Sequence, residues 1–159
     1  MDINYLLNKK PKTIKVSLKK INKTATIYSS DKRKSYVCLI KSGKVIVAKY
    51  ALDGERIFLK LLKKNDCFGE LELFSATKNL YDIIALTDCE IYFVSYTDIK
   101  KWMAVDFSFT EYLFKSMACK LENSSNYIVH SKQYTIYNRF LFLILENKVF
   151  NNVEVDKES

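Results

Sequence analysis

Residues 66–74, with the sequence DCFGELELF, hold the combination of residue types best suited to chemistry in this chain. Gly69 has no side chain, so its backbone can come very close to a ligand. The helical turn expected after it would present free N–H groups to an anion, and the Glu70 carboxylate can accept a hydrogen bond from a sugar hydroxyl. The segment therefore predicts a site for a small anionic ligand. The alternative interpretation is a plain turn from strand to helix in which Glu70 is a structural carboxylate.

The sequence offers few histidine and cysteine residues in the arrangements that metal sites need. His130 is the single histidine, which argues against the His-rich metal centre of a barrel-shaped oxygenase or isomerase. No two of the four cysteines form a C-x-x-C pair, so no zinc site is predicted: Cys38, Cys67, Cys89 and Cys119. We predict that the protein is not an enzyme, has no metal and uses its thiols as small apolar side chains. Convergence of the first three cysteines on an iron–sulfur cluster stays open.

Size and composition favour either one folded domain or one domain with a fragment of a second. The chain has 159 residues, of which 48% are hydrophobic and 28% charged, and this supplies enough apolar material for a core. The longest strongly apolar run covers only residues 140–145, far short of a membrane span. Because no signal peptide opens the chain either, we expect a cytoplasmic protein without a membrane partner.

Charge is unevenly distributed along the chain. The net charge is +8, and residues 1–64 are strongly basic whereas residues 65–159 are net acidic. Only 3 of the 26 basic residues are arginines. Few side chains can therefore form the paired hydrogen bonds by which a guanidinium group recognises phosphate or guanine. We interpret the lysines as a solvated sheet face, with long-range attraction to an anionic partner as the alternative.

Elements of two kinds must position these residues. Up to residue 93 the chain shows short runs of β-branched and aromatic residues separated by turns, which predicts a barrel or sandwich of strands. The expected strands cover residues 13–18, 24–28, 36–40, 44–50, 56–62 and 91–93. Gly43 marks a tight turn, and the pair Asp53 and Gly54 predicts a two-residue hairpin.

Helical patterns follow the strands. Residues 95–98 offer caps for a short helix through Ile99, Trp102 and Met103, and Asp106 and Ser108 are expected to open a longer one. The apolar residues of the longer stretch recur at steps of three and four over two faces. We expect one face to cover the barrel and the other to meet a partner. Thr135 is predicted to cap a last helix, after which residues 147–159 are mostly polar.

The segment around Gly69 resembles the phosphate-binding cassette of the cyclic-nucleotide-binding domain. Gly43, Gly54 and the triplet from Gly69 to Leu71 lie at the spacing found in Crp/Fnr transcription regulators, with no gap between them. Ser124, Ser125 and Arg139 fall in register further on. The resemblance covers about residues 24–139 and is most similar to the YeiL-like regulators over residues 126–146.

This resemblance implies a double-stranded β-helix (β-roll) followed by a long dimerisation helix, a mixed β and α fold. The implied domains are a sensing β-roll (1–96), helices that include the dimerisation helix (97–134), and the hinge and first helix of a winged helix-turn-helix (135–159), whose recognition helix is missing. The implied effector pocket consists of Gly69, Glu70, Leu71, Asn79, Leu80, Tyr81, Ser124 and Ser125. The implied homodimer interface consists of Phe109, Leu113, Met117, Lys120, Leu121 and Ser124.

One position departs from the family pattern. Cyclic-nucleotide binders place an Arg–Ser pair late in the cassette, where the guanidinium neutralises the cyclic phosphate. Here Asn79 to Tyr81 stand at that position, and no arginine occurs between Arg56 and Arg139. Lys78 could provide a point charge but not the fork. The sequence therefore predicts an effector other than cyclic AMP and no certain cofactor, with a cyclic nucleotide as the alternative ligand.

Two functions follow from these observations. The first is the sensory and dimerisation part of a Crp/Fnr-type regulator that contacts DNA through a C-terminal winged helix-turn-helix. The alternative is a stand-alone ligand-sensing module of the same fold that acts through a protein partner, with the basic residues 1–64 as its docking surface.

Overall fold

The structure, a computed structural model, describes residues 2–29, 35–50, 54, 56–75 and 81–133, with side chains described up to residue 125. The chain divides into two compact units, residues 1–117 and 118–159. The helices are α1 (Ile3–Lys9), α2 (Glu70–Phe74), α3 (Tyr96–Val105) and α4 (Phe107–Gln133). The strands are β1 (Val16–Ile21), β2 (Thr26–Tyr28), β3 (Tyr36–Ser42), β4 (Val45–Tyr50), β5 (Arg56–Leu62), β6 (Cys67–Phe68), β7 (Asp82–Ala85) and β8 (Cys89–Ser95).

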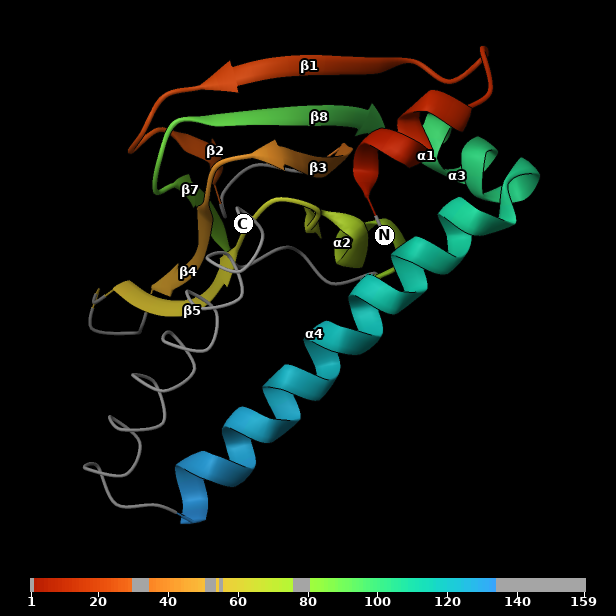
Figure 1. Cartoon of the computed structure of the whole chain (residues 1–159). Coiled ribbons are helices and arrows are strands. Elements are labelled where there is room, and N and C mark those ends of the chain that lie inside the picture. The colour runs from red at the N-terminus through yellow and green to blue at the C-terminus, as the bar shows by residue number, and fades with distance from the viewer. Residues whose placement is uncertain (1, 30–34, 51–53, 55, 76–80, 134–159) are drawn as a thin grey trace, which may run out of the picture. The chain divides into compact units, whose positions relative to one another are not determined.

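These strands form two antiparallel sheets in the first unit (Figure 1). One sheet has the order β1-β8-β3-β6 and the other the order β2-β7-β4-β5. Because the chain passes repeatedly from one sheet to the other, strands that are neighbours in sequence are mostly not neighbours in a sheet. This is the jelly-roll arrangement of the predicted β-roll, which the structure confirms.

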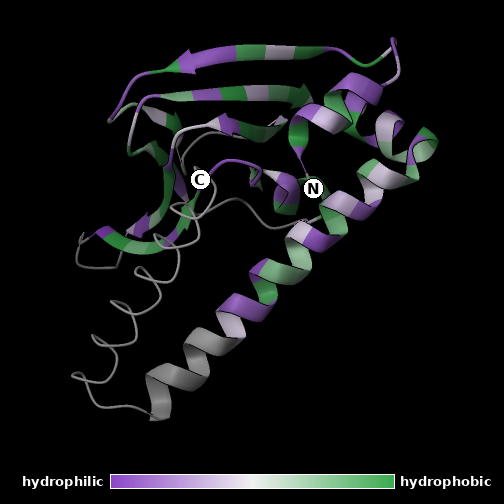
Figure 2. Cartoon of the chain, in the orientation of Figure 1, coloured by the Kyte–Doolittle hydropathy of each residue, from purple (hydrophilic) through white to green (hydrophobic). Residues whose placement is uncertain are grey.

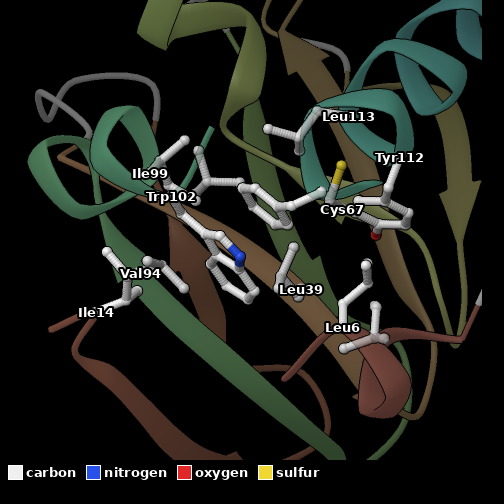
Figure 3. Packing of buried hydrophobic residues seen from close by; sticks show 12 residues of the cluster. Leu6, Ile14, Leu39, Cys67, Val94, Ile99, Trp102, Tyr112 and Leu113 are labelled. Atoms are coloured by element: carbon white, nitrogen blue, oxygen red, sulfur yellow. The ribbon is translucent and has the colours of Figure 1, made fainter. Parts of the chain in front are cut away.

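Apolar residues fill two buried clusters, one inside the β-roll and one between the roll and the helices. The second cluster is centred on Trp102, whose ring stacks on that of Phe109 at 3.8 Å between centroids and 4° between planes. Residues of α1, β3, β8, α3 and α4 contribute to it, as Figure 3 shows. The first turns of α4 are therefore part of the roll's core.

Asp106 fixes the junction between α3 and α4. Its carboxylate accepts hydrogen bonds from the backbone N–H groups of Ser108 and Phe109 at 3.0 and 3.3 Å, which caps the start of α4. The indole Nε1 of Trp102 donates to the same carboxylate at 3.1 Å. Ser95 caps α3 by accepting from the N–H of Asp98 at 3.1 Å. Both predicted helix starts are confirmed.

Most expected strands are present, with shifted ends. Strand β1 starts three residues later than the expected 13–18, and β8 is longer than 91–93 at both ends. The hairpin between β4 and β5 is present, with Tyr50 paired to Arg56. Of the predicted two-residue turn, Gly54 is described, whereas Asp53 lies outside the described residues. Helix α1 and strands β6 and β7 were missed. The predicted helix that starts at Thr135 lies outside the described residues.

Candidate functional site

The cassette is built around Gly69, which joins β6 to α2. Its backbone has φ 89°, a left-handed conformation that L side chains rarely adopt. A Cβ at this position would lie 2.5 Å from the carbonyl oxygen of Tyr36 on β3. The carbonyl of Gly69 accepts a hydrogen bond from the hydroxyl of Tyr96 at 3.1 Å. Only glycine therefore fits between β3 and the turn into α2.

Glu70 follows at the first position of α2 and is 1% exposed, the most buried charged residue described. Charged side chains are rarely buried this deeply in a protein unless they have polar neighbours. Its neighbour Leu71 is 53% exposed and faces solvent. The turn thus aims the carboxylate of Glu70 inward and the side chain of Leu71 outward.

Polar groups gather on the roll side of this turn. The Tyr28 hydroxyl donates to the carbonyl of Tyr36 at 3.0 Å and lies 3.4 Å from the Sγ of Cys38. The Tyr28 ring packs edge-on against Phe68, the residue before Gly69, at 5.7 Å between centroids. Sequence reasoning missed Tyr28 and Cys38, because nothing in the pattern of β2 and β3 shows that their polar atoms meet next to the cassette.

The titration behaviour of the two phenols reflects this environment. Burial raises the pKa of Tyr28 far above its ordinary value, and the adjacent Cys38 adds to the shift. Burial raises the pKa of Tyr96 to about 12, with Glu72 the next largest cause. Both phenols are therefore neutral hydrogen-bond donors at pH 7. The two phenols and the neighbouring groups that add to these pKa shifts are called the cassette cluster: Tyr28, Cys38, Glu70, Glu72 and Tyr96.

Hydrogen bonds join the cassette to the first turns of α4. The hydroxyl of Tyr112 donates to the backbone carbonyl of Asn65 at 3.1 Å. The Sγ of Cys67 lies 3.3 Å from the Oγ of Ser116. Burial also raises the pKa of Tyr112, so its phenol stays neutral and donates throughout the physiological range. The turn at Asn65 and strand β6, which lead into the cassette, are thus each tied to α4 at one point.

The remaining predicted pocket residues are only partly placed. Tyr81 is half-buried immediately before β7, whereas Asn79 and Leu80 lie outside the described residues. Ser124 and Ser125 are exposed on α4, in the second unit, and their hydroxyls donate to the carbonyls of Lys120 and Leu121 one turn earlier. Gly69 and Glu70 are therefore the predicted pocket residues that the structure brings together with the cassette cluster.

The predicted dimer interface needs a correction. Phe109 and Leu113 are 0% exposed and belong to the core with Trp102, so they are not available to a partner chain. Phe114, which the sequence analysis left out of the interface, is 58% exposed. Met117 and Lys120 are half-buried, whereas Leu121 and Ser124 are exposed.

The three buried cysteines do not converge. Cys38 lies beside Tyr28, Cys67 beside Ser116, and Cys89 donates to the carbonyl of Lys44 at 3.4 Å. In the part of the chain that the structure describes, no group of three or more His, Cys, Asp or Glu side chains could hold a metal ion. The iron–sulfur alternative is therefore wrong.

No described helix is long and apolar enough to cross a membrane.

The cassette and the two-sheet roll have a counterpart among known protein families. The family model of the cyclic nucleotide-binding domain matches residues 18–106, more than half of the chain. The chain belongs to the cyclic nucleotide-binding domain family. The match runs from β1 to the cap of α4 and includes the whole cassette.

One relative is a bacterial transcription regulator. A CRP-like cAMP-activated global transcriptional regulator of Mycobacterium tuberculosis is 24% identical over 101 residues, which are 64% of this chain and 45% of the relative. The chain thus matches less than half of that relative's length. Among solved structures, the catabolite activator protein of Thermus thermophilus is 18% identical with a TM-score of 0.66, over 82% of this chain and 58% of the other.

A second solved structure shows the same fold. The c-di-GMP responsive global regulator CLP of Xanthomonas campestris has a TM-score of 0.73 at 12% identity, over 82% of this chain and 66% of the other. At such identities the two structures establish the shared architecture of the roll and its following helix.

Proposed function

We propose that this chain is the sensory and dimerisation part of a DNA-binding transcription regulator that responds to an effector other than cyclic AMP. The observation that carries this proposal is the connection between the cassette and α4. Asn65 and Cys67, which lead into Gly69, contact Tyr112 and Ser116 of the helix. A ligand that shifts the cassette would therefore shift α4 as well.

The geometry supports a sensing mechanism in two steps. An effector that contacts the Glu70 carboxylate or the neutral phenol of Tyr96 favours one position of the turn at Gly69. Because the residues before Gly69 are hydrogen-bonded to α4, each position of the turn favours one orientation of the helix. In a dimer, the relative orientation of the two α4 helices determines the spacing of the DNA-binding domains that follow them. In this proposal, DNA is read by the C-terminal winged helix-turn-helix that the family resemblance implies.

The effector we infer carries no cyclic phosphate. The cassette cluster holds two carboxylates, Glu70 and Glu72, and the sequence has no arginine between Arg56 and Arg139. A buried phosphate without a guanidinium partner would leave its charge poorly compensated. An effector that donates hydrogen bonds fits this set of groups, because carboxylates accept hydrogen bonds and the hydroxyls of Tyr28 and Tyr96 already donate to backbone carbonyls.

The dimer face we propose is a stripe of exposed apolar residues on α4. Phe107, Phe114 and Leu121 follow one another at intervals of seven residues and are 79%, 58% and 70% exposed. A seven-residue apolar repeat supplies one of the two apolar positions, a and d, through which two helices pack as a coiled coil. The occupant of this stripe is therefore the same stripe of a second copy.

Sedimentation velocity tests the dimer with a matched pair of variants. Phe114→Glu places a charge on the stripe and should weaken dimerisation by about tenfold or more, since even 1.4 kcal/mol corresponds to a factor of ten. Cys119→Glu adds the same charge at another exposed position of α4, off the stripe, and should leave the dimer intact. A wild-type protein that sediments as a single chain, or two variants that dissociate equally, would contradict the proposal.

A further inference from the structure

A run of lysines begins at the end of α1 and continues along β1. Residues 9–23 contain seven lysines and no acidic residue. All of them are exposed except Lys10, which is half-buried. Figure 2 shows hydrophilic positions along β1 and on the segment that precedes it. We call this set the lysine strip: Lys9, Lys10, Lys12, Lys15, Lys19, Lys20 and Lys23.

We propose that the lysine strip binds the phosphate backbone of duplex DNA without reading its sequence. Strand β1 is the outer strand of the sheet β1-β8-β3-β6, so neighbours in the sheet flank it on one side alone. Six residues of an extended strand span roughly 20 Å. Lys19 and Lys20 lie on β1 and point to opposite faces of the sheet, and the other five lysines lie at the end of α1 or in the segments that flank the strand. Duplex DNA carries one negative charge per about 1.7 Å of its axis, so ammonium groups spread along this edge face several phosphates.

The composition of the strip favours phosphate over a protein partner. Protein interfaces are depleted in lysine and centre on aromatic or arginine anchors. Among residues 9–23, Leu18 is the one large apolar side chain with substantial exposure, at 44%. No arginine occurs among these residues. Lysine is a compact point charge that suits contact with phosphate but lacks the fork that reads guanine. The expected binding is therefore electrostatic and independent of sequence.

Two carboxylates neighbour the strip: that of Asp88, which accepts a hydrogen bond from the backbone N–H of Lys23 at 2.7 Å, and that of Glu90. Glu90 lies opposite Lys20 in the pairing of β1 with β8, but its carboxylate forms an ion pair with Lys41 at 2.8 Å. Lys19 packs its ammonium over the ring of Phe93 at 4.8 Å, which orders the side chain and keeps its charge. The choice of DNA among polyanions rests on the proposed function, because a regulator on its operator has duplex DNA close by.

Lysines on an edge strand also protect a sheet from pairing with other sheets. Protection against such pairing predicts a different result for the lysine variants than DNA binding does. If protection were their sole role, their removal would promote aggregation and leave DNA affinity unchanged. The test must therefore measure both properties on the same variants.

The experiment measures fluorescence anisotropy of a labelled duplex of about 30 base pairs and arbitrary sequence, titrated with the full chain from about 20 to about 150 mM salt. The strip variant is Lys15→Gln/Lys20→Gln/Lys23→Gln. The control variant, Lys44→Gln/Lys49→Gln/Lys64→Gln, removes the same charge from exposed positions on and near β4 and β5. Loss of three phosphate contacts should reduce the slope of log affinity against log salt by about 2 to 3 in the strip variant. The control should keep the wild-type slope.

Three results would overturn the proposal: equal losses in the two variants, displacement of the DNA by polyglutamate at equal charge concentration, or aggregation of the strip variant with unchanged DNA affinity. If aggregation prevents the measurement, Lys9→Gln/Lys12→Gln replaces it, since both residues lie outside β1. A wild-type chain that is a dimer by sedimentation but does not bind the duplex at the lowest salt would refute the strip and leave the proposed function standing.

Discussion

Substitution of Gly69 by alanine should destabilise the protein more than the same change at Gly54. Both glycines have left-handed backbones, with φ 89° and 85°, so alanine costs about 1–2 kcal/mol of conformational strain at either position. At Gly54 the new Cβ meets nothing within 4 Å, whereas at Gly69 it lies 2.5 Å from the carbonyl oxygen of Tyr36. Relief of that overlap requires β3 to move within a packed core, which adds about 1–3 kcal/mol. We therefore expect losses of about 2–5 kcal/mol for Gly69→Ala and about 1–2 kcal/mol for Gly54→Ala.

Urea unfolding followed by tryptophan fluorescence measures this difference. Trp102 is the single tryptophan and is 0% exposed, so its emission reports the core that holds the cassette. The midpoint should fall in both variants at an unchanged slope, and fall further for Gly69→Ala. Equal losses in the two variants would refute the close approach of the cassette to β3, on which the position of Glu70 depends.

Two further predictions concern pH and ligand. The hydroxyl of Ser108, and then the indole of Trp102 and the N–H groups that start α4, hold the pKa of Asp106 below its ordinary value. This stabilisation is complete above the unfolded pKa of about 3.9 and is lost as pH falls through the lower folded pKa. The loss should be smaller in Asp106→Asn, and identical pH profiles of urea stability would contradict this assignment. Cyclic AMP at about 1 mM should leave the thermal midpoint unchanged, whereas stabilisation near 2.7 kcal/mol, as for a ligand at a hundred times its Kd, would show that it binds.

The sequence predicts the roll well where turn residues and alternation coincide. Strand β5 has the expected bounds, and Gly43, with φ 90°, marks the turn between β3 and β4 as expected. Strand β6 was missed because two residues carry no periodicity, and it exists because β3 supplies its hydrogen bonds. Elements that depend on a distant partner strand leave little trace in their own sequence.

The faces of α4 show a similar limit. The spacing of apolar residues indicates two apolar faces but does not say which one the chain covers itself. The stack of Phe109 on Trp102 decides this by turning Phe109 inward and leaving Phe114 exposed. The cassette residues Gly69 and Glu70 could be predicted because a local motif defines them. Tyr28 and Tyr96 could not, because they reach the site only through the register of the strands.

Hydrogen exchange measured by mass spectrometry tests the coupling of the cassette to the dimer helix most directly. If the two are coupled, dissociation of the dimer in Phe114→Glu must alter the cassette to the same degree that the cassette alters the dimer. We expect faster exchange both along α4 and at residues 65–74 in Phe114→Glu than in Cys119→Glu. Exchange that changes along α4 alone would contradict this coupling.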